Sequence, residues 1–295
     1  MRIVADGLRC VAEEDGRVVG RAEAAHNPWM FHPRKYELRL EVDETHRRRG
    51  IGGALLARVL DQLRVREALV LRAVATENDA EAVGFLTRRG FREVWRQIPS
   101  ELDLASFDGA PFAARAARAG VAITTLAEEM AADRGVLREL YELHAFCTRG
   151  QQELDPITPR PFEEFVAGQV EGPQAMPEAW FLARDPLRGP KGGGVLVGMS
   201  SLERLLQKPD TLEPGYTAVH PDHRRRGIAL ALKLRAIEHA RSLGYRAIAT
   251  HSNAVNTGML ALNTALGFRP GPAMVTFELR LDRAPAAAPP SAARA

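Results

Sequence analysis

Hydrophobic and polar positions follow two alternating rhythms in the first third of the chain. Residues 38–42 alternate Leu, Arg, Leu, Glu and Val, a period-two pattern typical of a strand with one buried face. Apolar residues then recur at helical spacing, at Leu55, Leu56, Val59, Leu60 and Leu63. Residues 68–74 form an apolar run typical of a buried strand. The pattern therefore predicts strand, helix, strand.

The same order returns near the end of the chain. Residues 216–219 form a candidate strand, and an apolar helix face follows at Leu230, Leu234, Ile237 and Ala240. Gly244 is placed to end this helix, and residues 245–250 form the next candidate strand. A helix of this length between two strands predicts a right-handed crossover in a partly parallel sheet.

The two regions are related by an internal repeat. Residues 47–51 read Arg-Arg-Arg-Gly-Ile, and the same five residues recur 177 positions later at 224–228. The pair Gly90-Phe91 recurs as Gly267-Phe268 with the same separation. Because the spacing is kept from Val42 and Val219 to these pairs, we expect two copies of one structural unit.

The copies differ upstream of the repeat. In the first copy only two candidate strands, at residues 8–13 and 17–25, precede the alternating strand. The second copy has room for a strand at 121–126, helices at 134–148 and 161–170, and strands at 179–183 and 195–206. The sequence thus predicts a first domain (1–105) shortened at its N-terminus, a linker (106–119), a second domain (120–282) and a disordered Ala/Pro tail (283–295).

Composition narrows the class of protein. The chain has 295 residues, 45% hydrophobic and 26% charged, and 40 Lys plus Arg against 37 acidic residues. This balance predicts a soluble globular protein without a broad basic face, and no apolar stretch approaches the roughly 20 residues of a membrane span. Two cysteines, Cys10 and Cys147, and the lack of an export signal favour the cytoplasm. No His, Cys, Asp and Glu cluster has metal-ligand spacing, so we expect no metal site.

Each repeated turn places three arginines at the start of a predicted helix, which indicates an anion-binding site. A helix N-terminus has unpaired N–H groups and partial positive charge, so arginines there are unfavourable unless an anion binds. The glycines that follow let a backbone approach a ligand closely. Neither turn is a P-loop or a dinucleotide fingerprint. The pattern is typical of a cradle for a pyrophosphate group.

The motif resembles that of the GNAT (GCN5-related N-acetyltransferase) superfamily, which has Gln or Arg, two residues, Gly, one residue, then Gly or Ala. Arg47, Gly50 and Gly52 fit it, as do Arg224, Gly227 and Ala229. The family's later Asn, eleven residues before a Gly-Phe pair, is matched by Asn256. In the first copy Asp79 holds that place.

The resemblance implies a fold, an activity and a cofactor. The fold class is α/β (α+β), with two tandem GNAT-like domains, each a mixed, partly parallel twisted sheet flanked by helices, in a layout similar to that of mycothiol synthase. The activity is transfer of an acetyl group from acetyl-CoA to the amine of a small molecule or amino-bearing metabolite, by direct attack in a ternary complex. The first domain would be structural or would bind CoA without turnover.

Family analogy also assigns cofactor-binding residues. A strand splayed open at Val219 would bind the pantetheine arm, and the turn would bind the diphosphate. In the second copy these residues are Ala218, Val219, His220, Arg224, Arg225, Arg226, Gly227, Ile228, Ala229 and Asn256. In the first copy they are Glu41, Val42, Asp43, Arg47, Arg48, Arg49, Gly50, Ile51, Gly52 and Gly53.

Acyl transfer further needs a base for the amine and a proton for the departing thiolate. Glu213, six residues before Val219, resembles the catalytic glutamate of tandem family members, while His220 and His251 are other candidate bases. A solvated Glu213 and structural histidines are the alternatives. The tyrosine that serves many family members as general acid is replaced by Asn263 and Leu86, which leaves Tyr216, water or unassisted thiolate release.

Two other functions stay open. The missing tyrosines favour a non-catalytic CoA-binding or scaffold protein. The arginine triplets could contact nucleic-acid phosphates, although neither is interleaved with aromatic residues. The acceptor and the oligomeric state have no readable code in the sequence.

Overall fold

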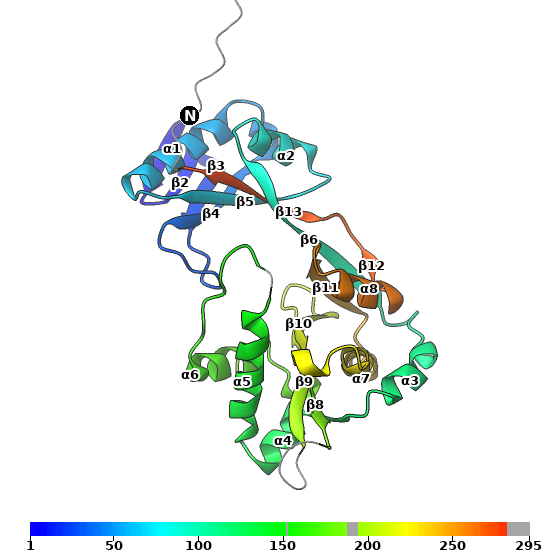
Figure 1. Cartoon of the computed structure of the whole chain (residues 1–295). Helices are drawn as coiled ribbons and strands as arrows, with labels where there is room; N and C mark the ends of the chain where they lie inside the picture. Colours follow the sequence, from blue (N-terminus) through cyan, green and yellow to red (C-terminus); the bar gives the residue numbers. More distant parts are fainter. Residues whose placement is uncertain (152, 188–193, 282–295) are drawn as a thin grey trace, which may run out of the picture. The chain divides into compact units, whose positions relative to one another are not determined.

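The computed structural model describes residues 1–151, 153–187 and 194–281, and it divides the chain into two compact units. Unit 1 comprises residues 1–96 together with the segment that begins at Ala273, and unit 2 comprises residues 97–272 (Figure 1).

Unit 1 is a mixed sheet with two helices. Its strands lie in the order β1 (Arg2–Asp6), β2 (Arg9–Glu14), β3 (Arg17–Ala25), β4 (Lys35–Val42), β5 (Val70–Thr76) and β13 (Met274–Arg280). Only the pair β4 and β5 is parallel, because the crossover helix α1 (Ile51–Val65) joins them. The short η1 (Glu44–His46) precedes α1, and α2 (Ala80–Thr87) follows β5.

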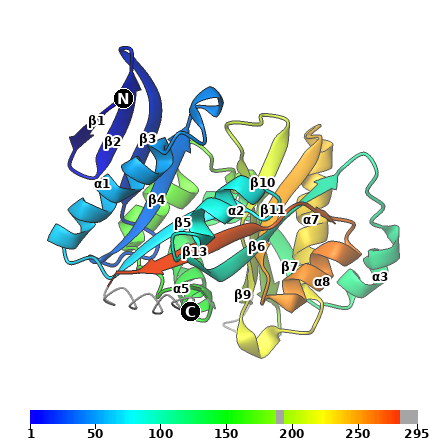
Figure 2. The ribbon, with the colours of Figure 1, turned by 90° about the horizontal axis from the view of Figure 1, so that it is seen from above.

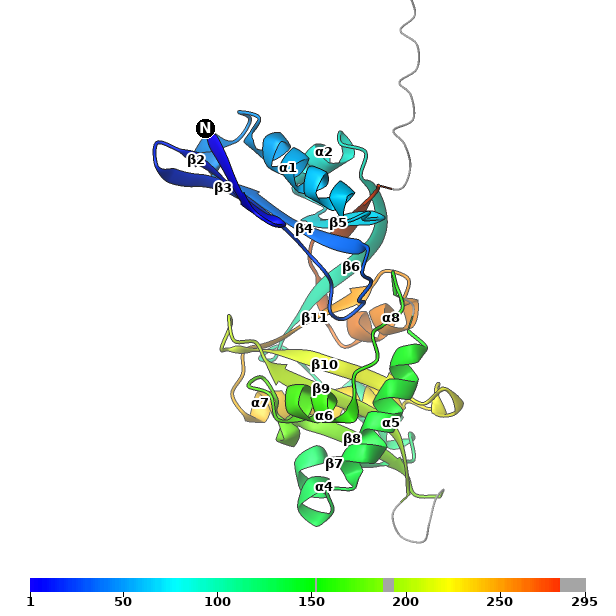
Figure 3. The ribbon, with the colours of Figure 1, turned by 90° about the vertical axis from the view of Figure 1, so that its left-hand side faces the viewer.

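The helix α1 packs on this sheet through the apolar face seen in the sequence. Leu55, Val59 and Leu63 are each at most 1% exposed. Gly20 of β3 lies below the helix, where an added Cβ would stand 3.1 Å from a Leu55 methyl group. Figure 3 shows α1 and α2 over one face of the sheet. As predicted, no helix other than the short η1 precedes α1 within the described residues of this unit. Three strands rather than the predicted two precede β4, because β1 has no counterpart among the strands predicted from the sequence.

Unit 2 is a mixed sheet with more helices than unit 1 within the described residues. Its strands lie in the order β6 (Arg92–Asp103, of which 97–103 belong to this unit), β11 (Ala247–Asn253), β10 (Thr211–Val219), β9 (Val195–Arg204), β8 (Trp180–Asp185) and β7 (Ala122–Thr125), and β12 (Arg269–Pro270) pairs with β6. Its helices are α3 (Ala110–Ala117), α4 (Leu126–Ala132), α5 (Val136–Arg149), α6 (Phe162–Phe165), the π-helical η2 (Val166–Val170), η3 (Pro177–Ala179), η4 (Pro221–His223), α7 (Ile228–Ser242) and α8 (Thr257–Ala265).

Both faces of the unit 2 sheet are buried. Phe181 and Ala183 of β8 join a core cluster with α7, whereas Trp180 and Leu182 join a second cluster with α5. Alternate residues of one strand point to opposite faces, so α7 and α5 lie on opposite sides of the sheet. Figure 3 shows α5 crossing one of these faces, and Figure 2 shows α7 beside β11.

The last strand of each sheet comes from the other copy of the repeat. Residues 97–103 and 274–280 are separated by the repeat distance of 177 and are therefore equivalent strands. Residues 97–103 pair antiparallel with β11 of unit 2, and 274–280 pair antiparallel with β5 of unit 1, in equivalent registers. The two copies have exchanged this strand.

The exchange changes the domain boundaries drawn from the sequence. Residues 97–105 lie in unit 2 rather than in a first domain ending at 105, and residues 273–281 lie in unit 1 rather than in a second domain ending at 282. The predicted linker, 106–119, contains α3, which packs on α7. Phe107 and Ala119, which flank α3, are buried in the unit 2 core. The predicted tail, 283–295, lies outside the described residues.

Candidate functional site

The first feature of the site is an opening between two parallel strands. In unit 2, β10 pairs with β11 only at Thr211 and Leu212, and β10 then continues to Val219 beside β9. Its register with β9 shifts by one residue between Pro214 and Thr217, which is a β-bulge. The edge of β10 that faces away from β9 can therefore pair with an extended, amide-containing ligand.

Unit 1 has a related opening without the bulge. Strand β4 pairs with β5 over residues 35–38, and residues 39–42 continue past the last pair. The register of β4 with β3 is unbroken from Gly20 to Ala25. Residues Glu41 and Val42, predicted to bind cofactor, lie on this open part of the strand, and Glu41 forms an exposed ion pair with Arg21 at 2.8 Å.

The second feature is the turn that leads into each crossover helix. Arg225 and Gly227 have φ of 61° and 86°, and Arg48 and Gly50 have nearly the same values, 60° and 84°. An arginine in the left-handed region is uncommon, so its presence in both copies marks one defined loop conformation. Across the described residues, no side chain caps the start of α1 or α7. The first N–H groups of both helices are therefore available to an anion.

The first arginine of each triplet ties the turn to the preceding strand. Arg224 Nε donates to the carbonyl oxygen of Val219 at 3.1 Å, and Arg47 Nε is 3.4 Å from that of Val42. The third arginine binds a carboxylate: Arg226 Nη1 lies 2.9 Å from Asp185, and Arg49 Nη2 lies 2.8 Å from Glu14.

Small residues keep these turns closely packed. A Cβ on Gly227 would lie 3.3 Å from the carbonyl oxygen of Arg115 in α3, and one on Gly52 would lie 3.1 Å from the Phe85 ring. A Cβ on Gly53 would lie 3.1 Å from the Arg89 guanidinium. Ile51 and Ile228, each the first residue of its helix, are buried, and Ala229 is half-buried. Packing therefore favours a small residue at Gly227 and Gly52 whether or not a ligand binds there.

The third feature is a carboxylate and imidazole pair beside the opening. Glu213 lies in β10, which begins at Thr211 rather than at the predicted residue 216, and its Oε1 is 3.3 Å from His251 Nδ1 on β11. The Glu213 side chain is 35% exposed and that of His251 is 52% exposed, so a solute can reach both. The hydrogen bond to Glu213 raises the pKa of His251.

Two further carboxylates at this place were missed from the sequence. Glu203 of β9 lies directly opposite Glu213, and Gly215 gives it room, because a Cβ there would lie within 2 Å of a Glu203 oxygen. Burial, followed by the Glu213 charge, raises the pKa of Glu203. Burial also raises the pKa of Glu153, which interacts electrostatically with His251. The pairing of Glu203 with Glu213 depends on the loop of 205–210 and on the bulge, and no sequence pattern predicts either.

Tyr216 lies on the bulged part of β10 and faces α5. Its N–H donates to Ser201 Oγ at 3.0 Å, and burial raises the pKa of its hydroxyl to about 12. The ring of His144 on α5 meets it edge-on at 5.2 Å, and burial lowers the pKa of His144 to about 4. At neutral pH the Tyr216 hydroxyl is therefore protonated and His144 is uncharged.

His220 follows β10 and is engaged locally. Its ring Nδ1 accepts from Asp222 N at 3.4 Å, and its ring stacks on Phe146 at 4.8 Å. Its backbone N–H donates to Val197 O at 2.8 Å. In unit 1 the equivalent Asp43 caps η1 by accepting from Thr45 N at 2.9 Å. Hydrogen bonds from Thr45 and His46 lower the pKa of Asp43 to about 2.

The asparagines of the second copy have structural partners. Asn256 caps α8 by accepting from Met259 N at 3.1 Å, and Asp79 caps α2 in the same way through Ala82 N at 2.9 Å. Asn263 is 3% exposed and donates Nδ2 to Ser252 Oγ at 3.2 Å. Its counterpart Leu86 is 5% exposed. The side chains at this position are buried in both copies.

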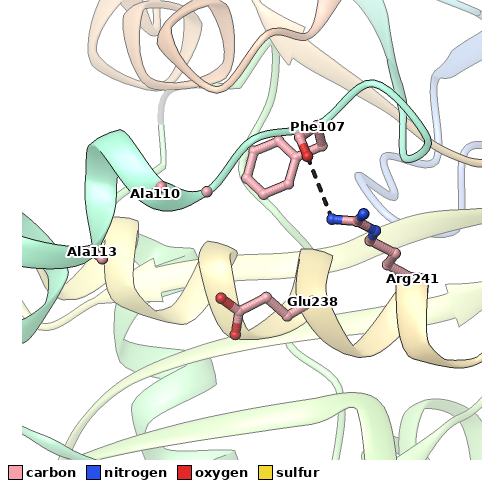
Figure 4. Close-up of a pocket in the computed structure, with 6 residues that line it drawn as sticks. Phe107, Ala110, Ala113, Glu238 and Arg241 are labelled. Atoms are coloured by element: carbon pink, nitrogen blue, oxygen red, sulfur yellow. Dashed lines mark hydrogen bonds between the residues drawn. The ribbon is translucent and has the colours of Figure 1, made fainter.

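A surface hollow elsewhere in unit 2 has a different lining. A cavity of about 230 Å³ lies between α3 and the C-terminal half of α7, lined by Phe107, Gly109, Ala110, Ala113, Glu238 and Arg241 (Figure 4). Arg241 donates to the Phe107 carbonyl oxygen at 3.5 Å. None of the residues proposed from the sequence lines it. In the described part of the chain, no group of three His, Cys, Asp or Glu residues could hold a metal ion, and no helix has the length and apolar character of a membrane span.

Comparison with known proteins agrees with this geometry. The family model described as "Acetyltransferase (GNAT) family" matches residues 2–91 and 137–268. No curated protein matches the sequence of the chain. The segment that contains α3 lies between the two matched regions.

Several solved structures share the fold over nearly the whole chain. A tandem GNAT protein from the clavulanic acid biosynthesis pathway has a TM-score of 0.69 and 22% identity, covering 94% of this chain and 83% of that one. A GCN5-related N-acetyltransferase from Sphaerobacter thermophilus has a TM-score of 0.68 and 17% identity, covering 93% and 81%. An acetyltransferase of the GNAT family from Colwellia psychrerythraea has a TM-score of 0.60 and 11% identity, covering 92% and 85%.

Proposed function

Because the chain belongs to the GNAT acetyltransferase family, we propose that it transfers an acetyl group from acetyl-CoA to the amine of a small molecule, and that unit 2 is the catalytic unit. One observation carries the proposal. The open edge of β10, the uncapped start of α7 and the Glu213–His251 pair all belong to unit 2, and strand β10 contributes to or leads into each of them.

The backbone supplies the cofactor site in this proposal. The N–H groups of residues 224–229 would hold the diphosphate of CoA, since a helix N-terminus favours an anion. Residues 218–220 on the open strand would pair with the amides of the pantetheine arm. Acetyl-CoA supplies the activated thioester, and the strand orients that thioester toward the bulge in β10.

Glu213 then serves as the base that accepts a proton from the acceptor amine. It is accessible and lies on the strand that lines the opening, and a general base must come within hydrogen-bond reach of the proton that it accepts. The free amine attacks the thioester carbonyl directly in a ternary complex. His251 orients the Glu213 carboxylate, and its raised pKa keeps a proton available for this hydrogen bond at mildly acidic pH.

The thiolate of CoA leaves with help from a neutral donor. The Tyr216 hydroxyl, with its pKa raised to about 12, can donate a hydrogen bond to the developing charge. Asn263 is unsuited to this step, because it is buried and its amide is bonded to Ser252. A thiol is acidic enough to leave as the thiolate without full proton transfer.

The test is release of free thiol from acetyl-CoA across a panel of amines, together with titration calorimetry of CoA binding. We expect CoA binding without an acceptor and thiol release that depends on a particular amine. Tight CoA binding with no thiol release for any amine would instead indicate a non-catalytic CoA-binding protein. A crystal soaked with CoA that shows the α7 turn blocked by protein side chains would overturn the cofactor site.

A further inference from the structure

We propose that the three arginines of each turn have separate roles, and that Asp185 and Glu14 are positioning residues for the phosphate-binding turn. The first arginine fixes the turn to its strand. The third is held by a carboxylate at the end of β8 or β2. The middle one, Arg225 or Arg48, contacts the diphosphate. This inference rests on the proposed function only in taking CoA as the ligand.

The carboxylate in unit 2 is fully engaged. Asp185 is the last residue of β8 and is 3% exposed. Its Oδ2 lies 2.9 Å from Arg226 Nη1 and 3.6 Å from His223 Nε2, and its Oδ1 accepts from Leu187 N at 3.1 Å. The hydrogen bond from Arg226 lowers the pKa of Asp185, so the carboxylate is charged at neutral pH.

Unit 1 has the same arrangement built from other residues. Glu14 is the last residue of β2, and its Oε1 lies 2.8 Å from Arg49 Nη2. Its Oε2 lies 3.5 Å from His46 Nε2. In each unit the carboxylate therefore stands at the end of the strand two places from the open one, and it faces one histidine and one arginine of the turn.

The two carboxylates do not correspond in the sequence repeat. The arginines and histidines are each 177 residues apart, but Glu14 and Asp185 are 171 apart and differ in side-chain length. A chance surface contact would not be rebuilt at the same place from a different acid at a different spacing. The common requirement is a fixed third arginine whose charge would otherwise oppose the positive helix end.

The middle arginine is the one that the turn leaves for a ligand. Within the described chain, no ion pair or hydrogen bond of the Arg48 or Arg225 side chain is found, and both lie in the left-handed region with φ of 60° and 61°. Arg224 is bonded to Val219 and Arg226 to Asp185. Arg225 is thus the arginine of this turn whose charge can pair with a phosphate without breaking a protein contact.

Loss of the Asp185 carboxylate should weaken binding of the diphosphate by the turn and should not affect transfer of the acetyl group. With Asp185 changed to Asn, Arg226 loses its partner and the turn loses a fixed point, so the diphosphate site becomes less ordered. The affinity for acetyl-CoA should fall, and the turnover number at saturating acetyl-CoA should stay near that of the wild type.

The experiment compares the dissociation constant of CoA, by calorimetry, among Arg225→Gln, Arg226→Gln, Asp185→Asn and the double variant of Asp185 and Arg226. We expect Arg225→Gln to weaken binding about tenfold or more, as for loss of a charged hydrogen bond. Asp185→Asn and Arg226→Gln should each weaken binding several-fold, and the double variant no more than the stronger single one, because the two side chains act as a pair. The proposal would be overturned if the double variant weakened CoA binding by the product of the two single effects while Arg225→Gln bound CoA like the wild type. That result would assign the phosphate contact to Arg226.

A second readout separates positioning from general destabilisation. The KM for acetyl-CoA should rise in Asp185→Asn, whereas the KM for acetylpantetheine, which lacks the diphosphate, should not change. An equal rise for both would show that the variant only loosens the fold. If CoA binds but no amine is acetylated, the proposed function fails and the binding comparison still tests the three arginine roles.

A control of similar distance but greater exposure is the Arg246–Asp210 pair of the same unit, with Nε 2.8 Å from Oδ2. Arg246 lies beyond the far end of α7, whose 15 residues span about 22 Å. Arg246→Gln and Asp210→Asn should leave CoA affinity within about twofold of the wild type. A comparable loss there would mean that any broken ion pair weakens binding, which would contradict a specific role for Asp185.

Discussion

The two units share the parts that would hold a diphosphate and differ in the parts that would do chemistry. Both have the left-handed arginine, the uncapped crossover helix and the carboxylate-bound third arginine. Only unit 2 has helices α4 to α6 before the open strand and a bulge in that strand. The repeat therefore preserves the loop that we propose binds the diphosphate, whereas the groups that we propose for catalysis surround that loop in unit 2.

Strand register sharpens this contrast at the proposed base. Leu71 and Ile248 are equivalent in the repeat, and they pair with Tyr36 and Leu212, respectively. The bulge adds one residue to β10, so positions before the bulge correspond at a separation of 176 rather than 177. Glu37 is therefore the counterpart of Glu213. Glu37 accepts from Asn27 Nδ2 at 2.7 Å. Val74 stands where unit 2 has His251, and Ala25 pairs with Glu37 where unit 2 has Glu203. Unit 1 therefore has the glutamate but lacks the histidine and the second glutamate that lie beside it in unit 2.

The largest expected effect comes from breaking the strand exchange. A chain that ends at Pro272 loses β13, whose Val275 and Phe277 are 1% and 4% exposed, and the buried Arg72–Glu278 pair at 3.0 Å. Each lost core side chain costs about 2–5 kcal/mol, so unit 1 should unfold while unit 2 retains its sheet. Limited proteolysis and thermal unfolding would measure this. A chain that ends at Leu281 is the control, and equal melting of both chains would refute the role of β13.

The comparison of the two glutamates gives the next effect. Glu213→Gln should lower kcat about 100-fold or more, since a general base contributes that much, and should leave CoA affinity unchanged. Glu37→Gln should change neither quantity. Steady-state thiol release and calorimetry provide both numbers. A fully active Glu213→Gln enzyme, or an equal loss in Glu37→Gln, would remove the distinction between the units.

A buried cation distinguishes the two crossover helices. Lys233 of α7 is 5% exposed, and burial lowers its pKa to about 8, whereas its counterpart in α1 is Leu56. Lys233→Leu should therefore stabilise unit 2 by roughly 3 kcal/mol at pH 7. The folded pKa lies below the unfolded one, so the wild type should gain stability as the pH rises from 8 to 10.5, and the gap to the variant should narrow. Thermal unfolding at several pH values checks this, and a gap that stays constant with pH would contradict it.

The smallest effect concerns His251, whose counterpart is the exposed Val74. The folded pKa of His251 is raised by Glu213, so its stabilising contribution is complete below the unfolded pKa near 6.5 and is lost as the pH rises through the folded value. His251→Val should lower stability at pH 5.5 by a fraction of a kcal/mol, because the pair is half exposed. The difference should shrink as the pH rises through the folded pKa of His251. A difference that grows with pH would show that the pair does not form.

Sequence patterns predicted the crossover units and the turns, because period and spacing are local properties of the chain. They did not predict the strand exchange, since residues 97–103 and 274–280 have equivalent patterns and either can complete either sheet. Glu203 and Asp185 were missed for a related reason. Their roles depend on register across β8, β9 and β10, which is set by the bulge between Pro214 and Thr217 and by the intervening loops. The functional roles of Glu213, Tyr216, His220 and Asn263 stay predictions.

The exchanged strand also bears on how the protein is made. The sheet of unit 1 is completed by residues more than 190 positions after β5 along the chain, so a ribosome adds them only after all of unit 2. Closing so long a loop is slow compared with local folding. Strands β1 to β5 therefore leave the ribosome with an unpaired edge on β5, so we expect the growing chain to depend on chaperones until β13 has been added.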